Sequence, residues 1–527
     1  MELLISSFVI IVAVALSNIA ARYVPKISST YINLVVGIIV GLIPMTNHLV
    51  LAFNNDIFMI FVLAPLLFLE GQATPLLIIR KKVKNIVGTA VILAVISAVI
   101  VTVAINQWFG LLISIALIIV AISTPTDATA FDSVVSGREI SQSLRKTLKM
   151  ESLFNDATGI ILLQAAILWL STGYLSFWTN MREFLIELVG GLIIGAVLAI
   201  LLIAFRQYFL RSTNNVISSQ TLIYILTPFC IYFVAEELGV SGIIAVVTAG
   251  LVHNSEANRS RFSSPRQMHL GIQVNNFAGE VLNSFVFVVL GISLERIFFS
   301  HYSAMTNSLQ WLAVGVLVYL LLLLCRYVYA RFFVTDKKRR TAILFALGGV
   351  HGTVTLAMTF SIANEISSAN FNFILIVETV VIILSMLVPT IAFKLILPRD
   401  LEVENKPTEL LRLRREMVKV GIERVKEMEL SPEVKASVIY DLRDQVQKNT
   451  MNSFFQQWKS VGSNKDVLTG LQSVEQRRAL MQAFNVERQY LYDLAKQHLV
   501  SSEYVYEIYS EILLSESLVL DPRNQMI

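Results

Sequence analysis

Apolar residues in this chain come in long runs separated by short polar loops, and the pattern continues from the N-terminus to about residue 398. A helix that crosses a lipid bilayer needs about 20 mostly apolar residues. Thirteen such segments are centred near residues 12, 40, 66, 96, 122, 160, 196, 227, 246, 282, 320, 352 and 384. The pattern therefore predicts an all-α, polytopic membrane domain over residues 1–398, with about 13 transmembrane helices.

The remaining residues, 399–527, are polar and charged, and their apolar positions recur at helical spacing, as in Leu410, Leu413 and Met417. This spacing predicts a separate α-helical domain, in which Ser431 is the N-cap of one helix. We expect this domain to regulate the membrane domain or to strengthen a dimer. The alternative is a scaffold for another protein, and the sequence names neither a ligand nor a protein partner for it.

The low charge of the chain changes what partners are expected. Only 15% of the 527 residues are charged, whereas a soluble protein carries about 25%. The net charge of +4 is small, and membrane topology explains it better than nucleic-acid binding does. The two cysteines lie in apolar segments, which argues against a disulfide framework or a metal site. We therefore expect membrane lipid as the surroundings, no nucleic-acid partner and no cofactor.

Basic residues alternate between successive loops. They gather near residues 22–26, 80–84, 138–149, 206–211, 259–266 and 331–340, while the intervening loops contain only Arg182 and Arg296. Cytoplasmic loops carry the excess of lysine and arginine. This alternation fits an odd number of spans and predicts a multi-pass protein of the plasma (inner) membrane, with the N-terminus outside and the C-terminal domain in the cytoplasm.

Two spans are interrupted near their middle. The fifth contains "STPTDATAFDS" (123–133) and the twelfth contains "LGGVHGTVTLAM" (347–358). If spans one to six and eight to thirteen are inverted repeats around the seventh, these two are the fifth member of each repeat. Paired interruptions at matched positions indicate two broken crossing helices and a substrate site near the bilayer midplane. The alternative is that proline and glycine only kink packed helices.

The sixth span opens with "ESLFND" (151–156), an unusually polar start for a membrane helix. Ser152, Asn155 and Asp156 are spaced i, i+3 and i+4, so they share one face of a helix. A carboxylate, a hydroxyl and an amide oxygen suit a small monovalent cation or a proton. One carboxylate does not hold both at once, and that exclusion would couple the two. A water-filled vestibule that tolerates polar residues is the alternative.

Two further acidic residues are candidates for the same site. Asp127 lies in the first interruption, where it could coordinate a cation together with exposed backbone carbonyls and threonine hydroxyls such as that of Thr126. It could instead neutralise the N-terminus of a half-helix, and we prefer that supporting role. Glu70, in the third span, is a second candidate ligand; the alternative is a glutamate at the membrane interface.

Arg326 is a basic residue in the middle of a span. A buried guanidinium requires a carboxylate partner. Glu151 is the expected partner, with Glu280 as the second choice. Pairing with Glu151 leaves Asp156 free to titrate.

Residues 5–397 resemble the sodium/proton antiporters of the cation/proton antiporter superfamily, in the NhaP/NHE branch. The resemblance rests on "PTDATA" (125–130), "ESLFNDATGI" (151–160), "FVFVVLGISL" (285–294), Arg326 and "GGVHGTVTLAM" (348–358). It implies thirteen helices, a homodimer and elevator-type alternating access. It also implies that Asp156 binds the cation or the proton, with Ser152, the backbone around Thr126, and Glu70 completing the site, and that Glu151 pairs with Arg326.

The resemblance further implies electroneutral exchange of one cation for one proton, because Asn155 precedes the aspartate. Many relatives have arginine at the position of His351, whose smaller side chain can lose its charge near neutral pH. His351 is therefore expected either to cap the broken twelfth helix, which we prefer, or to sense pH.

The predicted function is exchange of Na⁺ for H⁺, with Li⁺ or K⁺ as alternative cations and a K⁺/H⁺ antiporter of the same fold as the second candidate. An intramembrane aspartyl enzyme built on Asp127 and Asp156 would share a proton at close range, but it would leave the paired broken helices unexplained. A channel more often repeats its ion ligands by symmetry. We therefore expect a transporter and no enzyme activity.

Overall fold

The computed structural model describes residues 2–520 apart from a set of short segments and one longer one. Residues 25–26, 52–53, 75–82, 174–176, 211–216, 261–264, 301–308, 334–338, 364, 400, 447–469 and 498–499 lie outside the description. Parts of the basic loops on which the predicted orientation depends are therefore outside it as well. The chain divides into two compact units, Met1–Pro398 and Arg399–Ile527, and the described residues of both are helical, without a β-strand.

The first half of unit Met1–Pro398 contains α1 Glu2–Tyr23, α2 Ser29–Leu42, α5 Ala64–Ala73, α7 Ala94–Phe109, α8 Ile113–Ile122, α9 Ala128–Val134 and α10 Gln142–Thr172. Short helices α3 Pro44–Leu49 and α4 Asn55–Phe58 lie between α2 and α5, and π-helical turns Met59–Leu63 and Gly88–Leu93 precede α5 and α7. The second half contains α11 Phe177–Leu210, α12 Ile217–Glu237, α13 Gly242–Ser260, α14 Pro265–Ser300, α16 Gln310–Phe333, α17 Arg339–Leu347, α18 Thr353–Ser361 and α19 Ser368–Ile396.

The length and composition of these helices are typical of a multi-pass membrane protein. Seven of the described helices are long and apolar enough to cross a membrane by length and composition, and four further apolar helices are shorter. Each predicted span centre falls in a helix or, near residue 352, in a break between two half-helices. The number of thirteen spans remains a prediction.

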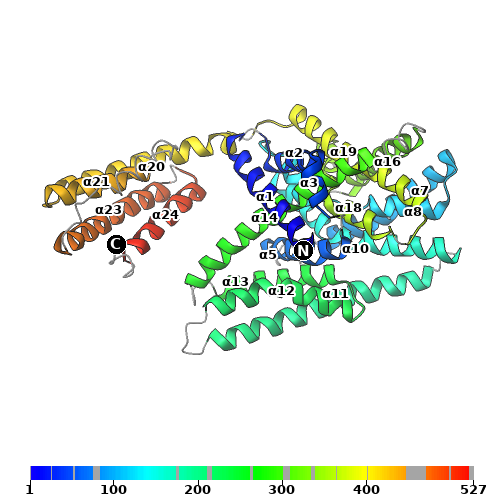
Figure 1. Cartoon of the computed structure of the whole chain (residues 1–527), viewed down its shortest axis with the longest axis horizontal. Helices are drawn as coiled ribbons and strands as arrows, with labels where there is room; N and C mark the ends of the chain where they lie inside the picture. The colour runs from blue at the N-terminus through cyan, green and yellow to red at the C-terminus, as the bar shows by residue number, and fades with distance from the viewer. Residues whose placement is uncertain are drawn as a thin grey trace. The chain divides into compact units, whose positions relative to one another are not determined.

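Two helix pairs approach each other closely through glycine. A Cβ atom on Gly37 of α2 would overlap the backbone of Val288 in α14, and a Cβ atom on Gly71 of α5 would overlap the carbonyl of Val247 in α13. Small residues let membrane helices pack backbone against backbone. Figure 1 shows α11, α12 and α13 side by side; these three helices contact one another, and α12 and α13 also contact α5.

Helix α8 lies inside the unit, and its sequence is apolar on all sides. Nine of its ten residues are buried, as expected for a helix that is hydrophobic on every side. The helices that pack around it are α7, α10, α18 and α19.

Both predicted interruptions are breaks in the structure. Helix α8 ends at Ile122 and α9 starts at Ala128, while α17 ends at Leu347 and α18 starts at Thr353. Pro125 has no backbone N–H to donate to a continuous helix. Gly348, Gly349 and Gly352 lie in the second break, and glycine disfavours a continuous helix.

Unit Arg399–Ile527 contains α20 Leu401–Glu427, α21 Pro432–Asp444, α23 Gly470–Lys496 and α24 Ser502–Leu520, which share one apolar core. Ser431 occupies the N-cap position of α21, as the sequence predicts, but its hydroxyl does not cap that helix. It donates instead to Glu475 of α23, at 3.4 Å. The predicted N-cap position is therefore confirmed, while the Ser431 hydroxyl bonds to α23 rather than to the backbone of α21.

Candidate functional site where the two broken helices cross

The two breaks are in direct contact with each other. The backbone N–H of Asp127 donates to the carbonyl of Val350 at 2.7 Å, and Nδ1 of His351 lies 2.8 Å from the carbonyl oxygen of Pro125. A break leaves backbone groups without helical partners, and a buried group of this kind must find one elsewhere. Each break therefore supplies partners for the other.

Asp127 is the N-cap of α9. Its Oδ1 accepts hydrogen bonds from the backbone of Thr129 at 2.8 Å and of Ala130 at 3.0 Å, and from the Thr129 hydroxyl at 2.7 Å. A carboxylate in this position satisfies free N–H groups and complements the helix dipole. Of the two roles that the sequence left open, the geometry matches the supporting one.

Gly352 leaves the space that the Asp127 carboxylate occupies, because a Cβ atom there would overlap it. We predict that Gly352→Ala lowers the free energy of unfolding by about 1–3 kcal/mol, the usual cost of overpacking. Thermal unfolding of the purified protein measures this. Gly279→Ala is the control, because its Cβ would meet only Leu69 Cδ1, at 3.8 Å. Equal unfolding temperatures for both variants would contradict the predicted clash.

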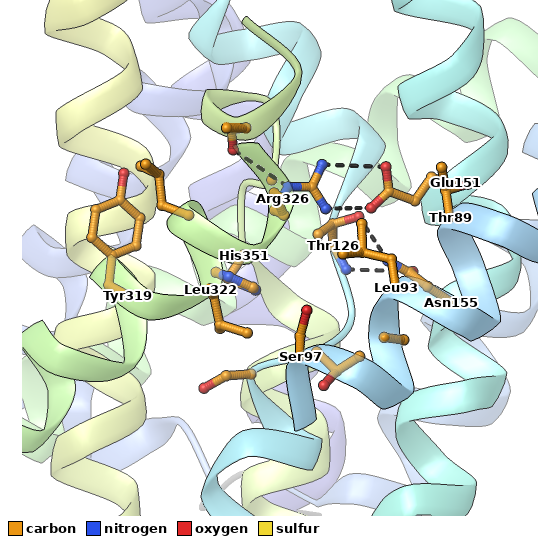
Figure 2. Close-up of a pocket in the computed structure, with 16 residues that line it drawn as sticks. Thr89, Leu93, Ser97, Thr126, Glu151, Asn155, Tyr319, Leu322, Arg326 and His351 are labelled. Atoms are coloured by element: carbon orange, nitrogen blue, oxygen red, sulfur yellow. Dashed lines mark hydrogen bonds and ion pairs between the residues drawn. The ribbon is translucent and has the colours of Figure 1, made fainter. Parts of the chain in front are cut away.

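Helix α10 holds the first break through two of the predicted site residues. The Ser152 hydroxyl donates to the carbonyl of Thr126 at 2.5 Å. Asn155 Nδ2 donates to the Thr126 hydroxyl at 2.9 Å, and Asn155 Oδ1 accepts from the Thr126 N–H at 3.4 Å. Figure 2 shows Asn155 joined to Thr126. The structure therefore brings Ser152, Asn155 and Thr126 together as one cluster.

Asp156 lies next to this cluster on α10 and is only 3% exposed. Its Oδ1 is buried without a hydrogen-bond partner among the described residues. Asp127 and Glu70 are close enough to act on it electrostatically. A buried carboxylate oxygen without a partner carries a desolvation cost, and a proton or a cation would remove it.

Glu70 lies on α5 and is half-buried. It interacts electrostatically with Asp156 and Asp127, but no hydrogen bond among the described residues joins its carboxylate to either. The structure therefore places Glu70 in the neighbourhood of Asp156 rather than in the hydrogen-bonded cluster.

Arg326 of α16 forms a buried, two-pronged ion pair with Glu151 (Figure 2). Its Nη2 lies 3.2 Å from Glu151 Oε2. The guanidinium also donates to the carbonyls of Phe345 at 3.2 Å and Ala346 at 3.3 Å, at the C-terminal end of α17, where a cation complements the helix dipole. The pair is the one that the sequence favours, and Glu280, the second choice, is exposed.

His351 does not cap α18. Gly352 is the N-cap residue, and no side chain caps this helix. The ring of His351 contacts the Pro125 carbonyl, as described above, and its backbone N–H donates to the Ser385 hydroxyl at 2.9 Å. The preferred capping role was therefore wrong, because the ring reaches across to the first break instead.

A cavity lies beside the crossing (Figure 2). It is lined by Thr89, Leu93, Ala94, Ser97, Ser123, Thr124, Thr126, Glu151, Asn155, Tyr319, Leu322, Leu323, Arg326, Ala346, Gly349 and His351. Asp156 and Glu70 do not line it. The cavity therefore reaches Thr126 and Asn155 from a side that does not include the Asp156 carboxylate.

Glu378 of α19 is a buried residue at the crossing that the sequence analysis missed. It accepts a hydrogen bond from the Ser123 hydroxyl at 2.8 Å. The sequence did carry a signal, because Glu378 is the one charged residue in an apolar run from Ile374 to Phe393, and an ionisable residue in such a run marks a functional site by default.

Comparison with known proteins gives matches over most of the chain. A family model described as "Sodium/hydrogen exchanger, transmembrane" matches residues 7–398. The sodium, potassium, lithium and rubidium/H⁺ antiporter of Bacillus subtilis (strain 168) is 30% identical over 454 residues, which are 81% of this chain and 66% of that protein. The protein of the same name from Bacillus pumilus (strain SAFR-032) is 27% identical, over 94% of this chain and 77% of its own. The match thus spans just under two thirds of the first relative.

The fold also resembles a solved structure, that of the sodium proton antiporter MjNhaP1 from Methanocaldococcus jannaschii. The TM-score is 0.57 at 19% sequence identity, and the match covers 75% of this chain and 98% of that one. At this identity the likeness shows a shared fold.

Proposed function

Since this chain belongs to the transmembrane sodium/hydrogen exchanger family, we propose that it exchanges a monovalent cation for protons across a membrane. The observation that carries the proposal is Asp156, a buried carboxylate with an unpartnered oxygen, beside two broken helices that meet. The names of the Bacillus relatives support Na⁺, K⁺ and Li⁺ as cations. The enzyme and channel alternatives gain no support from these relatives.

Competition at one carboxylate provides the coupling in this proposal. A cation and a proton both neutralise Asp156, and occupation by one excludes the other. In the neutral state the carboxyl loses most of its desolvation cost, so the site is favoured to move only when it is occupied. A cycle that always carries one of the two ions is an exchanger.

The hydrogen-bonded neighbours of the first break position the site. Ser152 and Asn155 fix Thr126 against α10, so the oxygens of the break are held in place before the cation arrives. Arg326 neutralises Glu151, which leaves Asp156 as the carboxylate that responds to ions. One titrating carboxylate predicts electroneutral 1:1 exchange. Glu70 would add a carboxylate from α5.

Alternating access by an elevator movement, with inverted repeats, is part of the proposal. If spans one to six and eight to thirteen are repeats, α2 and α5 are the equivalents of α13 and α14. The two close glycine contacts would then be equivalent. The contact of α5 with α13 and the contact of α2 with α14 each join a helix of one repeat to a helix of the other. The paired breaks of α8–α9 and α17–α18 support the same correspondence.

The remaining features of the proposal concern surroundings and assembly. We place the protein in the plasma (inner) membrane as a homodimer, with its N-terminus outside. Unit Arg399–Ile527 would lie in the cytoplasm and regulate transport or strengthen the dimer. The alternation of basic loops and the separate apolar core of that unit support this arrangement.

The test is proton flux in proteoliposomes that contain the full-length protein, driven by Na⁺, K⁺ or Li⁺ in turn. We expect cation-dependent flux in the wild type and a loss of at least about 100-fold in Asp156→Asn, which keeps the shape but removes the titrating charge. Asp132→Asn is the matched control, because Asp132 is half-exposed and paired with Arg145. Undiminished flux in Asp156→Asn would move the site elsewhere.

A further inference from the structure

A second buried carboxyl lies at the crossing, and the proposed exchange does not use it. Glu378 is 1% exposed and belongs to α19 Ser368–Ile396. At a rise of 1.5 Å per residue its Cα lies about 15 Å from one end of the helix and about 27 Å from the other. An ionisable residue at such depth costs on the order of 3 kcal/mol by insertion scales. A group retained at that cost calls for a function.

Only one of the two carboxylate oxygens of Glu378 has a hydrogen-bond partner among the described residues. Its Oε2 accepts from the Ser123 hydroxyl at 2.8 Å, while its Oε1 is buried without a hydrogen-bond partner among the described residues. No described cation forms an ion pair with it, in contrast to Glu151, which has Arg326. A lone buried carboxylate is strongly destabilised unless it is paired or protonated.

A purely mechanical role does not require an acid at this position. Helix α19 also contacts the second break, where the Ser385 hydroxyl accepts from the His351 N–H at 2.9 Å. Ser385 is two turns from Glu378 on the same face, since seven residues are close to two full turns. A neutral hydroxyl therefore suffices to hold one break. A glutamine would hold Ser123 equally well without the burial cost of an ionisable group.

Ser123 gives Glu378 a route for protons to the cavity. Ser123 lines the cavity beside the crossing, as does Tyr319, whose buried hydroxyl has no hydrogen-bond partner in the described part of the chain. A serine hydroxyl is both donor and acceptor. When the carboxyl releases its proton to Ser123 Oγ, the hydroxyl proton of Ser123 passes to an acceptor in the cavity, and uptake reverses both transfers. No other bond forms or breaks.

We propose that Glu378 is a second proton-binding carboxyl of the membrane unit, which exchanges its proton with the cavity through Ser123 and thereby sets the alkaline limit of transport. The proposal rests on the proposed exchange. While Glu378 is protonated, α19 places no uncompensated charge beside the first break. Once it ionises, a lone carboxylate lies against that break, and the crossing is destabilised. Glu378 does not bind the transported cation, so the 1:1 exchange at Asp156 is unchanged.

The groups around α19 do not offer Glu378 a compensating charge. Helices α8, α9, α14, α16, α17 and α18 pack against α19, and α8 and α18 contain no charged residue. The described titratable and charged groups of the others and of the two breaks are Asp127, Asp132, Glu280, Glu295, Arg296, Tyr319, Cys325, Arg326, Tyr327, Tyr329, Arg331, Arg339, Arg340 and His351. From α2, the Tyr31 hydroxyl contacts Thr390 of α19. Arg326 is held by Glu151, and Arg340 donates to the carbonyl of Ile396 at the end of α19.

Glu378→Gln tests the proposal, because the amide mimics the protonated carboxyl and can still accept from Ser123. Cation-driven proton flux is measured in proteoliposomes over a pH series. We expect the variant to keep exchange. On the alkaline side of the pH–rate profile (the alkaline limb), its rate should fall about one pH unit higher than that of the wild type. At a given pH on that limb, kcat of the variant should therefore be about ten-fold above that of the wild type. Ser385→Ala is the matched control. It removes the neutral contact to the other break, so it should lower the rate at every pH without moving the limb.

An infrared measurement gives a readout that does not depend on transport. The wild-type protein should show the carbonyl band of a protonated carboxyl that is missing in Glu378→Gln. A pH profile that superimposes on the wild type, a loss of exchange at every pH, or an unchanged infrared spectrum would each overturn the proposal. If the wild type itself shows no cation-driven flux, the proposed function fails instead, and the infrared band still decides whether Glu378 carries a proton.

Discussion

Arg326→Met is expected to lower the free energy of unfolding of the membrane unit by about 3–5 kcal/mol, the cost of leaving one member of a buried ion pair alone. Glu151 is 2% exposed and Arg326 is 10% exposed at their side chains. After the substitution Glu151 keeps its burial but loses the guanidinium, and the carbonyls of Phe345 and Ala346 lose their donor. Thermal unfolding in detergent measures the change.

The double variant Glu151→Met/Arg326→Met separates the unpaired charge from the loss of packing. Replacing both members of a buried ion pair by apolar residues is often neutral or stabilising, so we expect the double variant to recover a large part of the stability lost in Arg326→Met. The two carbonyls at the end of α17 stay without their donor, which limits the recovery. A double variant less stable than the single one would contradict the assignment of the cost to an unpaired Glu151.

The sequence predicts several contacts at the crossing because their cause is local. Asp127 directly precedes a helix and follows a proline that ends one, so a capping role follows from position alone. Ser152, Asn155 and Asp156 share a face by helical periodicity. Arg326 requires a carboxylate wherever it is buried, and few carboxylates are available in the spans.

Other contacts at the crossing depend on tertiary packing, which periodicity does not encode. His351 is two residues before the start of α18, and a local view favours a cap. Its position against Pro125 follows from how the two breaks cross. The sequence marks Glu378 as a lone charged residue in an apolar run, but its contact to Ser123 joins residues 255 positions apart.

The charged groups at the crossing fall into two sets, which differ in their contacts. Asp127 and Arg326 offset the partial charges at two half-helix ends, which stabilises the breaks. Among the described residues of the crossing, Asp156 and Glu378 are the buried carboxyls that have an unpartnered oxygen. In the proposed mechanism, these stabilised breaks surround the two groups whose charge state changes.

A third buried carboxyl, in unit Arg399–Ile527, predicts a pH-dependent stability for that unit. Glu487 of α23 is 0% exposed, and both of its carboxylate oxygens lack a hydrogen-bond partner in the described residues. Gly421 of α20 packs directly against it, since a Cβ atom there would overlap the carboxylate. Burial raises the pKa of Glu487 from 4.5 to about 8.

The sign of the pH dependence follows from this shift. Below pH 4.5 the carboxyl is protonated in the folded and the unfolded chain, so its contribution to stability is fully present. Between pH 4.5 and about 8 only the unfolded chain releases the proton. The free energy of unfolding therefore falls by up to about 1.4 kcal/mol per pH unit. Above the folded pKa the fall ends.

Glu487→Gln removes this titration, so we expect the variant to be more stable than the wild type by several kcal/mol near pH 8 and to lose the slope below it. Hydrogen-exchange mass spectrometry of α23 peptides in the full-length protein, corrected for the intrinsic effect of pH on exchange, gives the opening free energies. Glu423→Gln is the control, because Glu423 of α20 is an exposed carboxyl in the same unit. If Glu487→Gln keeps the wild-type slope, Glu487 is not the titrating group, and the instability at high pH has another source.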